Sequence, residues 1–269
     1  MKVTILGCSG SFAGPDSPAS SYLVRVDDGG RTWNLLFDLG SGALGPMQRH
    51  IAPRDVDAVF VTHLHPDHCA DLCGLYVARH YNPGGAPTER VPVWGPTGTA
   101  KRLALMYHGL EHHALQQVFD FRLLEDQVAI EVGPVRVVPY AVNHPVEAFG
   151  FRIEAQGQVL AYTGDTDTCD NLTPLLRDAD LVLSDSAFMD GRDDEFRGVH
   201  LTPSRAAQAA LDAGGVKRLM LTHMPAWNDP AVCREQAAAL WPDVEMVEFG
   251  ATYEVGSGDL DSVGESGAV

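Results

Sequence analysis

Apolar runs of strand length alternate with polar turns along the first sixty residues. The expected strands are residues 2–7, 21–26, 32–37 and 58–61. The turn Asp27–Gly30 joins two of them, and the glycine-, serine- and proline-rich segment 8–20 indicates a loop. The run at 58–61 is apolar at every position, which predicts a buried strand.

The middle of the chain, from residue 118 to 163, is rich in β-type sequence. Turns at Gly133-Pro134 and Gln156-Gly157 divide it. The expected strands are residues 127–132, 135–142, 148–154 and 158–162. This region therefore predicts consecutive strands with short connections.

Helical spacing of apolar residues marks other segments, which alternate with short strands. The expected helices are residues 71–81, 97–107 (with Thr97 as N-cap), 172–177, 203–213 and 231–240, and further strands are 91–94, 181–184, 218–222 and 252–255. Because each half of the chain carries both kinds of element, we expect an α/β fold with two β-sheets packed together and helices outside. We expect one domain over residues 1–255 and a disordered tail at 256–269, which is rich in glycine, serine and aspartate.

Potential metal ligands are concentrated directly after the buried strand, where residues 61–68 read VTHLHPDH. In an extended chain, His63 and His65 point to the same side, so both can hold one metal. Asp67 and His68 lie just past the strand end, where the proline turns the chain, and can reach a second metal. A chance cluster of surface histidines is the alternative, but metal ligands recur at such short, fixed spacings.

Three more potential ligands follow predicted strands elsewhere in the chain. His144 ends the run 135–143, Asp165 follows a strand and a glycine, and His223 ends the run 219–222. Each has an ordinary alternative, such as a capping aspartate or a buried histidine with a hydrogen-bond partner. Together with the first group they make five histidines and two aspartates at four strand ends, a number that fits two metals bridged by one carboxylate.

Other polar residues near these groups have less specific interpretations. Asp38 is either a partner that orients a ligand histidine or a turn aspartate. Cys69 is expected to be a small buried side chain rather than part of the site. A second histidine cluster, His108, His112 and His113, is expected at a helix end near the mouth of a cleft.

Composition narrows the classes of partner and the cellular location. The formal net charge is −17 and no basic run occurs, which argues against a long nucleic acid and favours a small anionic substrate. Five scattered cysteines without a CxxC pair favour reduced thiols, and a strand rather than a signal peptide follows Met1. No apolar run reaches about 18 residues, so no membrane span is expected. We expect a cytoplasmic protein, with a homodimer as the default assembly.

The order and spacing of the potential ligands resemble the metallo-β-lactamase superfamily, from about residue 2 to 255. The motifs are His63-x-His65-x-Asp67-His68, His144, Asp165 within Thr163-Gly164-Asp165-Thr166, and His223 after Thr222. The resemblance implies an αββα sandwich of two mixed β-sheets packed face to face, with helices outside. It also implies that one metal takes His63, His65 and His144, the other takes Asp67, His68 and His223, and Asp165 bridges them.

Segments 144–153 and 199–207 resemble the ribonuclease Z-like branch of that superfamily. Only about twenty residues separate His144 from Asp165, which leaves no room for the long tRNA-gripping arm of true ribonuclease Z. Where that enzyme has a His-Glu-Ala-Thr segment, residues 184–187 read Ser-Asp-Ser-Ala.

The armless layout, with segments 7–11 and 14–20, is closest to the atypical class II cyclic-AMP phosphodiesterases, so the resemblance implies hydrolysis of 3′,5′-cyclic AMP to 5′-AMP.

The implied chemistry needs two divalent metal ions. Mixed imidazole and carboxylate ligands suit Zn²⁺, and Mn²⁺ or Fe²⁺ are also compatible. A water shared by the metals would attack phosphorus as hydroxide at neutral pH. We expect His200 to protonate the leaving oxygen or hold a phosphate oxygen, Asp185 to orient His200, and Asp67 to serve in catalysis as well as metal binding. For His200, the alternative is a residue just ahead of the helix at Thr202-Pro203.

Three other functions stay open. A tRNA 3′-end endonuclease would need an RNA-binding surface, and a lactone or ester hydrolase would leave the His200 segment unexplained. A non-catalytic binder is disfavoured because all seven potential ligands are present. For a nucleotide, the loop 9–20 and the segment 81–113 are expected to line the pocket. The aromatic candidates for stacking are Tyr81, Trp94, Phe149 and Trp227, with burial in the core as the alternative for each.

Overall fold

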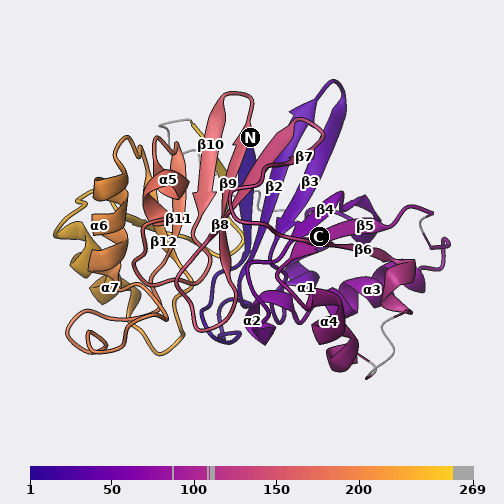
Figure 1. Cartoon of the computed structure of the whole chain (residues 1–269), viewed down its shortest axis with the longest axis horizontal. Coiled ribbons are helices and arrows are strands. Elements are labelled where there is room, and N and C mark those ends of the chain that lie inside the picture. Colours follow the sequence, from indigo (N-terminus) through magenta and orange to yellow (C-terminus); the bar gives the residue numbers. More distant parts are fainter. Residues whose placement is uncertain (87, 108, 110–112, 257–269) are drawn as a thin grey trace, which may run out of the picture.

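The computed structural model describes residues 1–86, 88–107, 109 and 113–256, and within them two seven-stranded β-sheets (Figure 1). In sheet order, the first consists of β14 (Thr252–Glu254), β1 (Lys2–Gly7), β2 (Ser21–Asp28), β3 (Arg31–Phe37), β4 (Ala58–Phe60), β5 (Val91–Gly95) and β6 (Phe119–Leu123). The second consists of β7 (Ile130–Val132), β8 (Val135–Ala141), β9 (Phe149–Ala155), β10 (Gln158–Tyr162), β11 (Leu181–Asp185), β12 (Leu219–Thr222) and β13 (Glu245–Met246).

Both sheets are mixed, and their strand pairings follow the same plan. In the first sheet, the pairs from β14 to β3 are antiparallel and those from β3 to β6 are parallel. In the second, the pairs from β7 to β10 are antiparallel and those from β10 to β13 are parallel. The two halves of the chain therefore share a topology, although no repeat is visible in the sequence.

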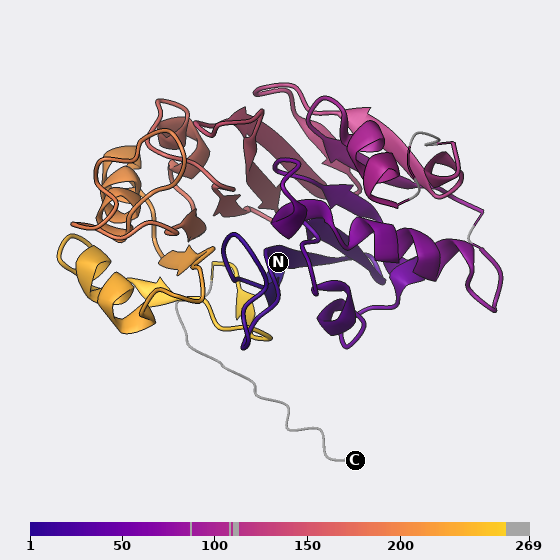
Figure 2. The same ribbon diagram turned by 90° about the horizontal axis from the view of Figure 1, so that it is seen from below.

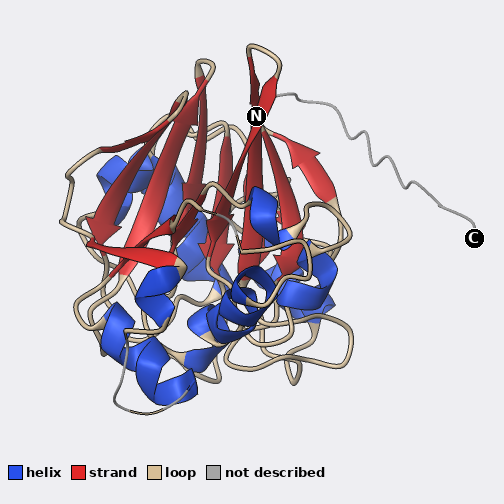
Figure 3. Cartoon of the chain, turned by 90° about the vertical axis from the view of Figure 1, so that its right-hand side faces the viewer, coloured by secondary structure: helices blue, strands red, loops and turns tan. Residues whose placement is uncertain are grey.

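Helices cover the outer face of each sheet. Near the first sheet lie α1 (Leu44–Met47), α2 (Pro66–Cys69), α3 (Leu72–His80) and α4 (Thr99–Tyr107), with 3₁₀ turns at Pro53–Asp55 and Leu115–Gln117. Beside the second sheet lie α5 (Leu172–Leu176), α6 (Pro203–Ala213) and α7 (Pro230–Ala238). Each helical layer packs on its own sheet through a separate cluster of buried apolar side chains. Figures 2 and 3 show these layers from two further sides.

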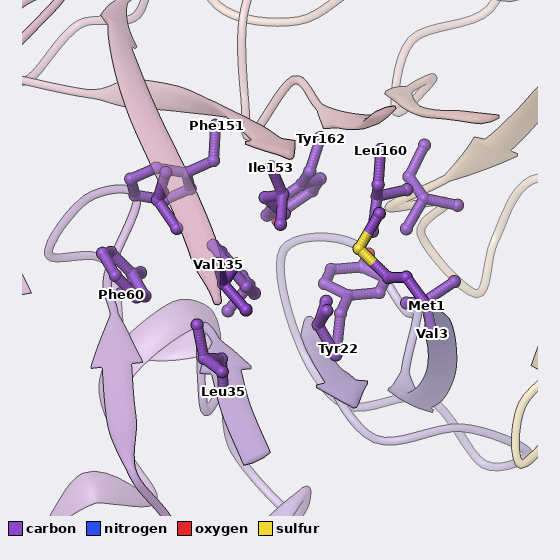
Figure 4. Close-up of a cluster of buried hydrophobic side chains, with 14 of the residues drawn as sticks. Met1, Val3, Tyr22, Leu35, Phe60, Val135, Phe151, Ile153, Leu160 and Tyr162 are labelled. Carbon is purple, nitrogen blue, oxygen red and sulfur yellow. The ribbon is translucent and has the colours of Figure 1, made fainter. Parts of the chain in front are cut away.

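The largest apolar cluster fills the space between the two sheets (Figure 4). Tyr22, Leu35 and Phe60 enter it from the first sheet, and Phe151 and Tyr162 from the second. The Phe60 and Phe151 rings meet edge to face at 5.7 Å, a favourable arrangement for aromatic pairs. Burial of both inner faces holds the sheets together, so the predicted architecture of two mixed sheets packed face to face with helices outside is confirmed.

Several details differ from the sequence prediction. The helix expected from Thr97 begins at Thr99, because Gly98 has a positive φ of 88° and the Thr97 amide instead donates to Glu147. The edge strands β6 and β13 were not expected, and neither were the one-turn helices α1 and α2. The predicted disordered tail falls outside the described residues from position 257 on. Among the residues described, no helix is long and apolar enough to cross a membrane.

Candidate metal centre

The potential ligands meet at the edge of the sandwich where strands of both sheets end. His63, His144 and Asp165 each come three residues after a strand, namely β4, β8 and β10, and His223 directly follows β12. His65, Asp67 and His68 belong to the start of α2, which lies at the lower edge of the sheets in Figure 1. The sequence prediction that all seven residues come together is therefore met by the geometry.

Three imidazoles form a first group whose ligand atoms lie within 4.8 Å of one another: His63, His65 and His144. His65 Nδ1 lies 2.9 Å from His63 Nε2 and 3.3 Å from His144 Nε2. Three ring nitrogens that converge on one point are a typical arrangement for a zinc ligand set.

A second group, under the same 4.8 Å limit, contains Asp67, His68, Asp165 and His223. Asp165 is central in it, with Oδ1 3.2 Å from His68 Nε2 and Oδ2 3.1 Å from His223 Nε2. The same Oδ2 lies 3.7 Å from His63 Nε2 of the first group. Asp165 thus stands between the two groups, the position that the family resemblance implies for a bridging carboxylate.

Buried polar atoms in this region lack hydrogen-bond partners among the described residues. They are His68 Nε2, His223 Nε2 and Asp165 Oδ1, and their side chains are at most 3% exposed. An unpaired buried polar atom costs about 1–3 kcal/mol, so three of them at one point need an explanation. A divalent cation would supply it, because imidazole nitrogens and carboxylate oxygens are its usual ligands. The residues present fit such an ion.

The pKa values of the histidines in the site agree with binding of a divalent cation. Burial lowers the pKa of His63, His65 and His144, which leaves these rings neutral, as metal ligation requires. Burial also opposes the charge of His68, but the carboxylates of Asp165 and Asp38 raise its pKa well above the ordinary value. Without an ion, the buried carboxylates thus draw a proton onto His68, and a cation would take over this compensating role.

Asp38 fixes the orientation of His68. The His68 Nδ1–H donates to Asp38 Oδ2 at 2.8 Å, which leaves Nε2 free to face the second group. The carboxylate is itself held by the Thr62 amide at 2.8 Å and the Tyr162 hydroxyl at 2.9 Å. Of the two interpretations of Asp38, this hydrogen bond favours the orienting one.

Two other histidines of these groups have partners that the sequence did not indicate. His144 Nδ1 donates to the Val199 carbonyl at 2.9 Å, and His223 Nδ1 shares a 2.8 Å hydrogen bond with Ser20. Ser20 lies 203 residues from His223 in the chain. Its place at the end of the serine-containing loop before β2 was the only signal, and it is too weak to identify the contact.

Close backbone approaches keep the loops in place around the site. A Cβ at Gly40 would lie 1.8 Å from the Asp67 carbonyl oxygen, and one at Gly10 would lie 2.1 Å from the His223 carbonyl oxygen. Only glycine allows either contact. The loops after β1 and β3 are therefore packed directly on the segments that carry the ligands.

A buried Asp185–His200 pair adjoins the metal-ligand groups. His200 Nδ1 lies 2.9 Å from Asp185 Oδ2, and the carboxylate also accepts the backbone amides of Thr166 and Ala187, each at 3.0 Å. Burial would lower the pKa of His200, but the charge and hydrogen bond of Asp185 outweigh it and raise the pKa to about 9. His200 Nδ1 is 3.9 Å from Asp165 Oδ2. The predicted pair is thus formed at the site.

A cavity of about 360 Å³ opens next to His200. Its lining includes Ser11 from the first loop, Phe188 and Arg192 from the segment after β11, and Trp227 from the segment after β12. Residues of the predicted loop 9–20 do contribute, whereas none of the described residues between 81 and 113 lines this cavity.

The aromatic candidates divide between core and surface. Trp94 and Phe149 are buried between the sheets, whereas Tyr81 and Trp227 are exposed. In the second histidine cluster, His108 and His112 lie outside the described residues and His113 is exposed.

Comparisons with known proteins agree with this geometry. A model of the beta-lactamase superfamily domain matches residues 33–224. The uncharacterized protein ML1173 of Mycobacterium leprae is 39% identical over 259 residues, or 95% of this chain and 89% of the relative. The probable metallo-hydrolase YhfI of Bacillus subtilis is 26% identical over 256 residues, covering 94% of this chain and 100% of YhfI. The crystal structure of YhfI matches with a TM-score of 0.82 over 94% of this chain and 98% of that chain.

A ribonuclease Z is also among the relatives. That of Ligilactobacillus salivarius is 23% identical over 310 aligned positions, which cover 95% of this chain and 97% of the ribonuclease. Because 310 exceeds the 269 residues of the chain, the ribonuclease carries insertions relative to it. The family model spans most of the chain, and the clustered histidines and aspartates suit divalent metals. This chain therefore belongs to the beta-lactamase superfamily, as a metal-dependent hydrolase with ribonuclease Z-like relatives.

Proposed function

We propose that this hydrolase is a phosphodiesterase for a small diester, with 3′,5′-cyclic AMP as substrate and 5′-AMP as product. His63, His65 and His144 would hold one metal, Asp67, His68 and His223 the other, with Asp165 between them. Two divalent ions, when bound, would supply an acidified water as nucleophile and neutralise the charge of the phosphoryl oxygens. Zn²⁺ is the expected metal, with Mn²⁺ as the alternative.

The buried Asp185–His200 pair is the observation that carries this proposal. Cleavage of the 3′ ester bond releases an alkoxide, which must take up a proton. Asp185 is fixed by two backbone amides and occupies His200 Nδ1, so the other nitrogen, Nε2, would carry the proton to the leaving 3′-oxygen. Asp67 would add a carboxylate beside the attacking water. A lactone or ester hydrolase would also release an alkoxide, so turnover on each substrate separates the two functions.

The connection between His144 and Asp165 supports a small substrate. Apart from the short segments 145–148 and 163–164, it consists of β9, the turn at Gln156-Gly157 and β10, and the two strands pair with each other in the sheet. These segments are too short for a protruding arm, and the ribonuclease Z relative carries insertions that this chain lacks. The net charge of −17 also disfavours a long RNA. A tRNA endonuclease is therefore the second candidate, favoured only by its place among the relatives.

Turnover of Zn²⁺- or Mn²⁺-loaded protein on cyclic AMP tests the proposal, with bis-p-nitrophenyl phosphate as a generic diester. We expect conversion to 5′-AMP that stops on addition of a chelator. Asp165→Asn should lose this activity, whereas Asp180→Asn, which alters a buried aspartate away from the site, should retain it. Cleavage of the generic diester alone would redirect the assignment to tRNA precursors, and no cleavage of either would favour a lactone or ester hydrolase.

Three wider proposals accompany this function. First, residues 1–255 would form one domain. Second, the negative net charge would repel long nucleic acids, and the protein would form a homodimer. The five cysteines are free thiols, which fits a reducing cytoplasm.

A further inference from the structure

The cavity beside His200 has an exposed aromatic residue at its mouth. Trp227 lines the cavity, yet 64% of it is exposed. Phe12 packs against its ring at a centroid distance of 4.9 Å and a tilt of 46°. Phe12 is itself 40% exposed, so this pair presents apolar ring surface to solvent. Exposed aromatic surface next to a cavity typically marks a binding site.

The loop that carries Trp227 is tied to the candidate metal centre. It begins directly after His223, and Ser9 bridges to Met224. Gly10, next to Ser9 in the chain, packs against the His223 backbone. The position of Trp227 relative to the second ligand group is thus fixed by a short and well-packed segment.

His200 connects the cavity with the metal-ligand groups. It lines the cavity and lies 3.9 Å from Asp165, and the Phe188 ring in the cavity wall packs against it at 5.0 Å. A phosphoryl group held at the metal centre would therefore extend its sugar past His200 into this space. The volume of about 360 Å³ lies within the usual range for small-ligand sites.

We propose that this cavity binds the base of a nucleotide by stacking on Trp227, with Phe12 positioning the indole. The inference rests on the proposed phosphodiesterase function and specifies how its substrate is recognised. Stacking on an aromatic ring suits any base, because each base presents a π face. A second copy of the chain is the rival occupant of this aromatic surface, but the concave lining continuous with His200 favours a small ligand.

Paired calorimetric titrations of zinc-loaded protein with 5′-AMP and ribose 5-phosphate test the proposal. Both ligands carry the same phosphate and sugar, so their affinity ratio isolates the base. We expect 5′-AMP to bind roughly 5- to 150-fold more tightly. Trp227→Ala should remove this preference, and Trp227→Phe should keep most of it. Tyr81→Ala removes an equally exposed aromatic residue (63%) outside the cavity and should leave the ratio unchanged.

Several results would overturn the base site: equal affinities in the wild-type protein, no binding of 5′-AMP, or a preference that survives Trp227→Ala. An unchanged ratio in Trp227→Ala, together with conversion of a dimer to a monomer in light scattering, would show that the surface is a subunit interface. A Trp227-dependent preference for 5′-AMP in a protein that does not hydrolyse cyclic AMP would instead leave the base site standing and reject the phosphodiesterase.

Discussion

Two buried aspartates at opposite ends of the second sheet have contrasting surroundings. Asp180, just before β11, is fully paired: Oδ1 accepts Lys217 Nζ at 2.6 Å and Oδ2 accepts the Val159 amide at 2.7 Å. Asp165, just after β10, leaves Oδ1 without a hydrogen bond among the described residues and faces a group of histidines. At the end of the sheet that contains Asp180, the buried carboxylate is paired within the protein. At the end that contains Asp165, a buried carboxylate oxygen has no such partner in the described part of the chain and can bind an ion. The difference distinguishes a carboxylate whose partners are all within the protein from one whose oxygen is available to an ion.

Asp165→Ala should have the largest effect. If Asp165 joins two metals, its loss should abolish diester hydrolysis, exceeding the roughly 10- to 100-fold cost of removing a partner that only orients a ligand. Bound metal should fall as well, measured by elemental analysis of the purified protein. Asp180→Ala is the matched control and should keep its metal. Full activity of Asp165→Ala would remove the distinction between the two aspartates.

His200→Ala should retain both metals but lower kcat by about 10²- to 10⁴-fold, the usual contribution of a general acid. Metal content and turnover are measured on the same sample. Wild-type turnover would reject the role of His200, and loss of metal would show that it acts as a ligand instead.

Addition of Zn²⁺ should stabilise the protein against unfolding, because the ion would satisfy the unpaired atoms of the folded state. At 100 to 1,000 times its Kd the gain is about 3–4 kcal/mol, which thermal unfolding in the presence and absence of chelator measures. Asp180→Asn should retain this gain and Asp165→Ala should lose most of it. An equal gain in both variants would place the ion elsewhere.

Asp180→Asn should have the smallest effect, confined to stability. Burial raises the pKa of Asp180, but the hydrogen bonds of Lys217 and Val159 lower it below its ordinary value. A carboxyl whose pKa is lower in the folded state contributes stability above its unfolded pKa of about 4 and loses it as the pH falls through the folded value. Because Lys217 is exposed, we expect a loss of only about 1 kcal/mol at pH 7. Chemical unfolding at pH 7 and pH 3 should show this loss shrinking in acid. A constant difference would mean that charge is not its cause.

The sequence predicted most of the central strands and the seven histidines and aspartates that cluster at the candidate centre, since buried strands have clear apolar patterns and metal ligands have short spacings. It did not predict β6, because Phe119–Leu123 is an edge strand with charged residues and an exposed end. The contact between Ser20 and His223 spans 203 residues and has no local pattern. For Trp227 the sequence left both stacking and burial in the core open, since nothing in it distinguishes an aromatic residue on the wall of an open cavity from a buried one.

The potential ligands also come from the two sheets in an order along the chain that matters during synthesis. His63 to His68 belong to the first sheet, whereas His144, Asp165 and His223 belong to the second. A nascent chain released only up to β10 would carry the three-histidine group, but the second group is complete only once residue 223 has left the ribosome. Completion of the candidate metal centre would therefore be a late event, and an unfinished polypeptide would lack the second group of potential ligands.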